Sequence, residues 1–239
     1  MTERPTRLSV GVLSGNLARL AEELAILDGS DSWAHVDVMD GDFVPQLTVG
    51  PAFLRAVAAT GVPVDAHLMV TEPRRFLEPV VAVDPALVTV HVESTRHLYR
   101  TFVELTELAG DRRLLRGVAV NPGTPVGAIE PVLDLVDLVL VLAVEPGWPN
   151  QEPAPRTAER IAAARELTAG SDRPVLVGVD GGVTLSNLTE VVAWQPDLIV
   201  SGSAVFGAGD ASRNLDRIRR ALAAPEADLE PAARNGRVL

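Results

Sequence analysis

Three side chains that could take part in acid–base or metal chemistry alternate along one short stretch of the sequence. His35, Asp37 and Met39 share one face of a strand predicted over residues 33–39, and the two valines between them lie on the other face. A strand buried on both faces is normally apolar throughout, so this polar face requires an explanation. A solvent-exposed edge strand would supply one, but the apolar flanking residues argue against it.

Side chains of the same chemical types also lie at the ends of three other predicted strands. Three of the four histidines in the chain lie at strand ends. These positions are Asp65, His67 and Met69; His91 and Glu93; and Asp180. Two histidines and two aspartates, His35, Asp37, His67 and Asp180, form a donor set suited to one divalent ion, Zn²⁺, Fe²⁺, Mn²⁺ or Co²⁺. The alternative interpretation of His67 or His91, each taken alone, is a hydrogen-bonded histidine in the core. No role is assigned to His97.

The two aspartates at separate strand ends also suit two-base proton transfer across a substrate. Asp37 and Asp180 would face each other, and a metal ion between them would stabilise an adjacent enediolate oxygen. Met39 and Met69 would form a polarizable wall beside the planar intermediate, with simple core filling as the alternative.

Two short glycine-containing segments predict a phosphate-binding end of the site. Gly181 and Gly182 follow the seventh predicted strand, and Gly202 and Ser203 follow the eighth. Backbone N–H groups after these two strands of a barrel often hold phosphate, and glycine lets the backbone approach closely.

The elements that must position these residues alternate regularly between strand and helix. Strands are predicted over residues 8–13, 33–39, 62–69, 87–91, 114–120, 136–144, 175–180 and 198–201. Amphipathic helices are predicted between and after them, over residues 17–26, 51–59, 73–81, 97–108, 125–133, 155–168, 185–193 and 211–222. Eight such units predict an α/β fold, a single (β/α)₈ TIM barrel. A doubly wound sheet is the alternative, but no Gly-rich fingerprint follows the first strand.

We expect the barrel to span residues 1–223 and residues 224–239, rich in alanine, proline and charge, to form a flexible tail. The widest gap between strands holds the sequence EPGWPNQEP, residues 145–153. Its prolines and glycine predict a loop, and in a barrel this loop would lie over the C-terminal mouth as a lid.

The composition excludes several classes of function. The formal net charge of −11 argues against nucleic-acid binding but permits a small phosphorylated substrate. The chain has no cysteine, and all 21 basic residues are arginine, so thiolate and lysine chemistry are excluded. No signal peptide or membrane span is apparent, which favours a cytoplasmic protein with no membrane partner. Barrels of this type commonly form homo-oligomers through their outer helices.

Five motifs together resemble the ribulose-phosphate 3-epimerase family: HVDVMDGDFVP, DAHLMV, NPGTP, VDGGV and SGSAVF, in order over about residues 9–206. The resemblance implies an isomerase of pentose phosphate and carbohydrate metabolism that inverts C3 of a ketopentose 5-phosphate through a cis-enediolate. It implies one divalent metal ion held by His35, Asp37, His67 and Asp180, with Asp37 and Asp180 as the acid/base pair. It also implies substrate contacts from His67 and phosphate contacts from Gly181, Gly182, Gly202 and Ser203.

The sequence departs from the family pattern in three places. A substrate-contacting serine of the family falls on Gly11, and its third active-site methionine falls on Leu142. The family's PGFGGQ lid is PGWPNQ here, so Pro149 and Asn150 replace two glycines, although Gly147 is kept as an expected substrate contact. Proline fixes φ and removes an N–H donor, which alters how the loop can hold phosphate.

These observations favour a metal-dependent epimerase of D-ribulose 5-phosphate and D-xylulose 5-phosphate. An epimerase of a related ketose phosphate, such as allulose 6-phosphate, is an alternative that the altered residues leave open. A metal-dependent aldolase or hydrolase barrel and a non-catalytic sugar-phosphate-binding barrel are the others, although a binding protein has no need of two facing aspartates.

Overall fold

The computed structural model describes residues 6–148 and 151–223, and within them eight parallel strands close into a barrel. Each strand pairs with its neighbours in sequence, and β1 also pairs with β8. The strands are β1 (Arg7–Gly11), β2 (Trp33–Met39), β3 (Val64–Met69), β4 (Leu87–His91), β5 (Leu115–Val120), β6 (Leu138–Leu142), β7 (Leu176–Asp180) and β8 (Leu198–Val200). The predicted TIM barrel is therefore confirmed.

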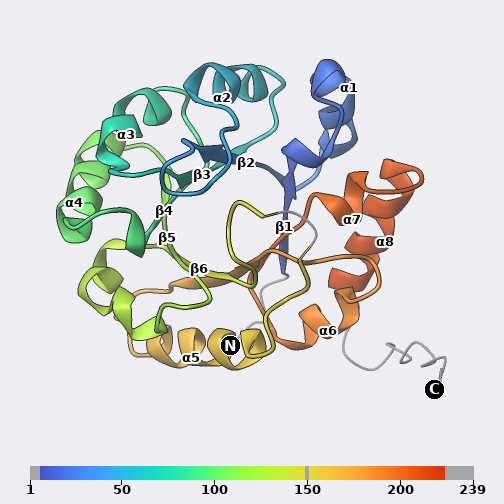
Figure 1. Cartoon of the computed structure of the whole chain (residues 1–239). Helices are drawn as coiled ribbons and strands as arrows, with labels where there is room; N and C mark the ends of the chain where they lie inside the picture. Colours follow the sequence, from blue (N-terminus) through green and yellow to red (C-terminus); the bar gives the residue numbers. More distant parts are fainter. Residues whose placement is uncertain (1–5, 149–150, 224–239) are drawn as a thin grey trace.

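Helices surround the barrel, as the view along its axis shows (Figure 1). The α-helices are α1 (Leu20–Leu24), α2 (Pro51–Ala58), α3 (Arg74–Val81), α4 (Leu98–Ala109), α5 (Thr157–Ala169), α6 (Leu188–Ala193), α7 (Ser203–Phe206) and α8 (Ala211–Ala223). The 3₁₀ segments are η1 (Val12–Ser14), η2 (Leu17–Arg19), η3 (Ala25–Leu27), η4 (Val92–Ser94) and η5 (Val126–Leu135). No helix in the described ranges is long and apolar enough to cross a membrane.

Two predicted helices differ from the expectation. The segment after β1 is divided into η2, α1 and η3, with the Asn16 side chain accepting a hydrogen bond from the N–H of Ala18 at its start. The segment after β5 is the 3₁₀ helix η5, which contains Pro131. Proline has no N–H and its ring crowds the preceding turn, which disfavours a regular α-helix, although α3 accommodates Pro79, so packing also contributes to the 3₁₀ form of η5. The four-residue helix α7 was not predicted.

Strand alternation divides the side chains between two environments. Along β3, Val64, Ala66 and Leu68 pack outward in the large core between strands and helices. The residues between them point into the barrel, where Asp65 and His67 are buried. A barrel strand is thus buried on both faces, and a polar residue on its inner face must find its partners inside the barrel.

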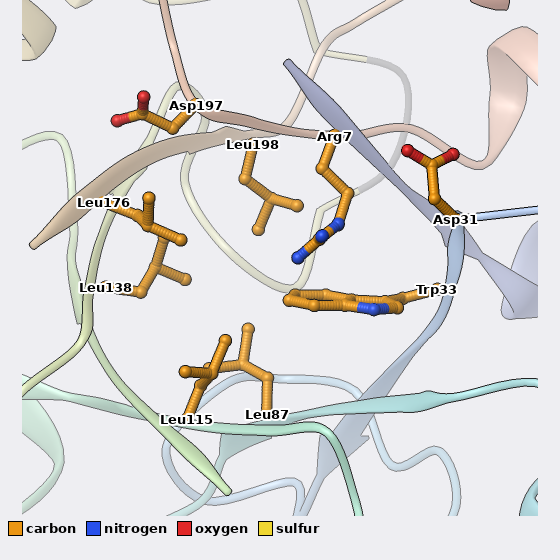
Figure 2. Close-up of a pocket in the computed structure, with 9 residues that line it drawn as sticks. All are labelled: Arg7, Asp31, Trp33, Leu87, Leu115, Leu138, Leu176, Asp197 and Leu198. Carbon is orange, nitrogen blue, oxygen red and sulfur yellow. The ribbon is translucent and has the colours of Figure 1, made fainter. Parts of the chain in front are cut away.

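The N-terminal mouth of the barrel holds a hollow of about 300 Å³. The first residues of seven strands line it, and Figure 2 shows the Arg7 guanidinium above the Trp33 ring, 4.5 Å from the ring centroid, with five leucines around it. Two aspartates, Asp31 and Asp197, also line this end, whereas His35, Asp37, His67 and Asp180 gather towards the opposite, C-terminal end. In barrels of this type chemistry takes place at the C-terminal end, so the hollow is not the reaction site.

Candidate functional site

Four inward-pointing side chains converge near the C-terminal end of the barrel: His35, Asp37, His67 and Asp180. One potential ligand atom from each lies within 4.8 Å of all the others. Asp37 and His67 are register partners on β2 and β3, whereas Asp180 ends β7 and reaches the cluster across the barrel. The residues predicted as a metal-binding set from strand alternation are thus brought together.

Both histidines contact both aspartates. Nε2 of His35 lies 3.0 Å from Oδ1 of Asp37 and 3.8 Å from Oδ2 of Asp180. Nδ1 of His67 lies 3.0 Å and 3.4 Å from the same two oxygens. The histidines are buried, with 1% and 0% of their side-chain surface exposed, whereas the two carboxylates are 23% and 13% exposed. The carboxylates therefore form the part of the cluster that a substrate can reach.

The charges in the cluster shift its pKa values in opposite directions. Burial works to lower the pKa of His35, but the charges of Asp65 and Asp37 outweigh it and raise that pKa well above its ordinary value. Burial also works to lower the pKa of His67, but hydrogen bonds to Asp180 and Asp37 outweigh it and raise that pKa. Burial would raise the pKa of Asp37, but His35 and His67 hold it far below its usual range. A cation that binds through His35 and His67 therefore competes with protons for their ring nitrogens.

A second group of polar side chains lies behind the histidines, and its pairing with them was not predicted from the sequence. Nδ1 of His35 lies 2.7 Å from Oδ2 of Asp65, an oxygen that also accepts a hydrogen bond of 2.6 Å from the Ser9 hydroxyl. Behind His67, Nε2 lies 2.8 Å from Nε2 of His91. Asp65 and His91 were named from the sequence as polar residues at strand ends, whereas Ser9 was missed, although alternation places it on the inner face of its strand as well.

The two methionines predicted to form a wall of the site lie together at the ends of their strands. Met39 and Met69 are register partners at the ends of β2 and β3 and form a small buried group with Val44, against which Phe43 packs. Asp40 fixes the segment that contains Phe43 and Val44, because its Oδ1 accepts hydrogen bonds from the N–H groups of Asp42 and Phe43. The segment after β2 is thus folded over the site.

The predicted phosphate-binding residues lie in the neighbouring loops after β7 and β8. Gly181 and Gly182 have φ values of +106° and +68°, a region that favours glycine. The loops are joined because the hydroxyls of Ser201 and Ser203 both donate to the carbonyl oxygen of Val183. Gly202 packs closely against β1, since a Cβ there would lie 2.5 Å from the carbonyl oxygen of Gly11.

The predicted lid lies against the segment after β2. Gly147 has φ +89°, and a Cβ on it would meet Val44 and Pro45 at 2.9 Å. The Gln151 amide donates to the carbonyl oxygens of Glu145 and Trp148, which ties the two ends of the loop together. Trp148 is 57% exposed. Pro149 and Asn150, the two altered lid positions, are outside the described residues, as is the predicted tail at residues 224–239.

Two positions that depart from the family pattern lie beside members of the cluster. Gly11 is the register partner of His35, and Leu142 is the register partner of Asp180. Leu142 is buried in the barrel interior. Two of the changes predicted from the sequence to alter substrate binding are therefore on neighbouring strands at the level of cluster residues.

A closed (β/α)₈ barrel with facing carboxylates at its C-terminal end defines the class of TIM-barrel enzymes. Solved structures support the fold: 3-hexulose-6-phosphate synthase from Salmonella typhimurium superposes with a TM-score of 0.66 at 14% identity, covering 91% of this chain and 98% of that one.

Sequence comparison identifies the particular family within this class. The model of the ribulose-phosphate 3 epimerase family matches residues 7–206. The chloroplastic ribulose-5-phosphate-3-epimerase of Arabidopsis thaliana is 40% identical, over 89% of this chain and 75% of that protein. The ribulose-phosphate 3-epimerase of Mycobacterium bovis is 35% identical, over 93% and 95%. The chain belongs to the ribulose-phosphate 3-epimerase family and is an isomerase.

Proposed function

We propose that this protein is a metal-dependent ketose-phosphate 3-epimerase that interconverts D-ribulose 5-phosphate and D-xylulose 5-phosphate. The observation that carries the proposal is the convergence of Asp37 and Asp180, from β2 and β7, on the same two histidines. Epimerisation at a carbon next to a carbonyl is achieved directly by a base on one face and an acid on the other. Two carboxylates from separate strands can act as this pair.

In the proposed mechanism, one of the two carboxylates removes the proton from C3 of the substrate. The electron pair of the C–H bond moves into the C2–C3 bond, and the C2 carbonyl becomes an enediolate oxygen. The other residue, as a carboxylic acid, returns a proton to the opposite face of C3 and restores the carbonyl with inverted configuration. Each turnover exchanges the protonation states of Asp37 and Asp180, so solvent protons must reset them.

The donor set fits a resident divalent ion. His35, Asp37, His67 and Asp180 supply two nitrogen and two carboxylate ligands, the combination that Zn²⁺, Fe²⁺, Mn²⁺ and Co²⁺ accept. When bound, the ion supplies positive charge that stabilises the negative oxygen of the enediolate. The raised pKa values of His35 and His67 make binding dependent on proton release.

The glycine loops after β7 and β8 are the proposed phosphate end. These loops offer the backbone N–H groups of Gly181, Gly182, Gly202 and Ser203 to a phosphate. At the three glycines no side chain would hinder the approach of the phosphate. The substrate would then extend from these loops towards Asp37 and Asp180, with Met39 and Met69 against the planar intermediate. Gly147 of the lid completes the proposed substrate contacts.

An epimerase of a related ketose phosphate, such as allulose 6-phosphate, is the second candidate. The observation that favours it is the absence of a side chain at Gly11 next to His35, together with Leu142 next to Asp180. We further propose that the enzyme acts in pentose phosphate metabolism in the cytoplasm and assembles as a homo-oligomer, with no nucleic-acid or membrane partner.

The test is an epimerase assay in D₂O with a panel of ketose phosphates and added divalent metal. Deuterium should enter C3 during turnover of the true substrate. Asp37→Asn and Asp180→Asn should each abolish epimerisation, while Asp42→Asn, a change to an exposed aspartate in the segment after β2, should not. If no ketose phosphate exchanged its C3 proton, the epimerase proposal would be wrong. Binding without exchange would favour a non-catalytic sugar-phosphate-binding barrel.

A further inference from the structure

The two histidines of the cluster present different ring nitrogens to it. His35 faces Asp37 and Asp180 through Nε2, whereas His67 faces them through Nδ1. An imidazole binds a metal ion through an unprotonated nitrogen, so its other nitrogen must carry the proton and needs an acceptor. His35 therefore requires an acceptor for a proton on Nδ1, and His67 requires a different acceptor for a proton on Nε2.

We propose that Asp65 and the His91–Glu93 pair are positioning residues that fix the tautomer and orientation of His35 and His67. This inference rests on the metal site of the proposed function, because its consequence is the strength and geometry of metal binding. It concerns residues that lie outside the four-residue donor set and do not reach the substrate.

The acceptor for His35 is the Asp65 carboxylate. Its Oδ2 lies 2.7 Å from Nδ1 of His35 and also accepts the Ser9 hydroxyl at 2.6 Å. Asp65 is 1% exposed, and its other oxygen accepts no hydrogen bond within the described part of the chain. A buried carboxylate that leaves one oxygen unpaired is costly, so its retention points to a requirement other than stability. Holding the proton of His35 on Nδ1, away from the site, is such a requirement.

The acceptor for His67 is a second histidine. Nε2 of His67 lies 2.8 Å from Nε2 of His91, and the two rings are nearly parallel, with an interplanar angle of 9°. Two facing ring nitrogens can share only one proton in a hydrogen bond. If Nδ1 of His67 binds metal, Nε2 must donate that proton, and Nε2 of His91 must accept it.

This requirement fixes the tautomer of His91, whose proton must then lie on Nδ1. That atom lies 3.4 Å from Oε2 of Glu93 and has no hydrogen-bond partner within the described residues, so Glu93 is the carboxylate placed to hold a proton there. Glu93 is itself fixed, because its Oε1 accepts the N–H of Asn121 at 2.8 Å. The Glu93 carboxylate, which lies outside the barrel interior, therefore determines which ring nitrogens of His91 and His67 carry protons.

Phe43 supports this arrangement from the other side. Its ring packs against His91 with centroids 4.9 Å apart, and Phe43 belongs to the segment after β2 that folds over the site. The rotation of His91 is thus limited by His67 on one side and by Phe43 on another. A change at Glu93 alters the position of the proton rather than the packing of the rings.

The test compares two glutamates of similar exposure in the full-length protein. Glu93 and Glu104 are 23% and 25% exposed, and Glu104 pairs with Arg74 instead of a histidine. Zinc affinity is measured by competition with a chromophoric chelator, and histidine tautomers by long-range ¹H–¹⁵N correlation spectra. The chain has four histidines, and exposed His97 serves as an internal reference.

We expect Glu93→Ala to weaken zinc binding roughly 10- to 100-fold and to abolish the single tautomer of His91. Glu93→Gln keeps a carbonyl acceptor and should recover much of the affinity, while Glu104→Ala should bind zinc as the wild type does. Asp65→Asn, if it folds, should have a similar effect on His35, and the Glu93 variants test the inference independently of it.

Unchanged zinc affinity and unchanged tautomers in Glu93→Ala would overturn the inference, as would equal losses in Glu93→Ala and Glu104→Ala. If the wild-type protein did not bind zinc or another divalent ion, the metal site of the proposed function would fail instead. The two failures are therefore distinguishable.

Discussion

Replacement of Gly181 by alanine should destabilise the protein for two separable reasons. Gly181 directly follows Asp180 and has φ +106°, which L-residues rarely adopt. A Cβ on this residue would also lie 2.4 Å from Cγ2 and 3.2 Å from Cγ1 of Val144, in the loop after β6. The first reason is local backbone strain, and the second is a clash between two loops over the site.

The two contributions can be given magnitudes. A positive φ costs an alanine roughly 1–2 kcal/mol. An overlap that forces a neighbouring segment to move costs a further 1–3 kcal/mol or so. Gly181→Ala should therefore lower the free energy of unfolding by about 2–5 kcal/mol. Because Asp180 is the preceding residue, the displaced backbone should also lower epimerase activity.

A double-mutant cycle with Val144→Ala separates the two reasons. Removal of both Val144 methyl groups leaves its Cβ 3.3 Å from the new side chain, a tight but tolerable contact. In the Val144→Ala background, the Gly181 substitution should cost only the backbone strain. Gly61→Ala measures that strain alone, because Gly61 has φ +84° and a Cβ there would meet nothing within 4 Å. Urea unfolding provides the free energies.

The outcome that would refute this reasoning is additivity. If Gly181→Ala had the same cost in both backgrounds, the contact with Val144 would not be its cause. If Gly181→Ala had no greater cost than Gly61→Ala, the close approach of the two loops would contribute nothing.

Three further changes have defined outcomes. Burial works to raise the pKa of Asp137, but Arg116, with Arg173, lowers that pKa below its ordinary value. The Asp137 carboxylate therefore stabilises the folded protein above about pH 4, and this stabilisation is lost as the pH falls through the folded-state pKa. Asp137→Asn should therefore cost about 2 kcal/mol at pH 7 and progressively less in acid, by urea unfolding. Zinc at 100-fold over its Kd should stabilise the protein by about 2.7 kcal/mol relative to chelator-treated protein, by calorimetry. Gly11→Ser should lower kcat/KM, because a Cβ there would lie 3.2 Å from Cα and N of Gly202 and would displace a proposed phosphate loop.

The sequence predicted the barrel and the members of the cluster because both depend on alternation. In a parallel strand buried on both faces, every second residue points inward, so a polar residue on that face is conspicuous. His35, Asp37 and His67 could be found in this way. Asp180 could be found because it ends a strand immediately before two glycines.

The connections between these residues could not be predicted, because they depend on which atoms of neighbouring strands face each other. The sequence places Asp65 and His91 on inner faces, but only the strand register brings Asp65 beside His35. The stacking of His91 on His67 depends on side-chain rotation, which alternation does not specify. For the same reason, the helix predicted after β5 was wrong in type: Pro131 is compatible with several local conformations, and packing selects among them.

Two of the three differences from the family pattern, Gly11 and Leu142, are register partners of residues in the His35, Asp37, His67 and Asp180 cluster. Gly11 lies beside His35 and Leu142 beside Asp180 in the strand register, and each faces the barrel interior. Gly11 also contacts the loop after β8, because Gly202 approaches its carbonyl oxygen closely. A change at Gly11 is therefore coupled to the position of the proposed phosphate contacts. If Asp37 and Asp180 transfer the protons as proposed, substitutions at Gly11 or Leu142 should change which ketose phosphates are turned over, while the exchange of the C3 proton with solvent is retained.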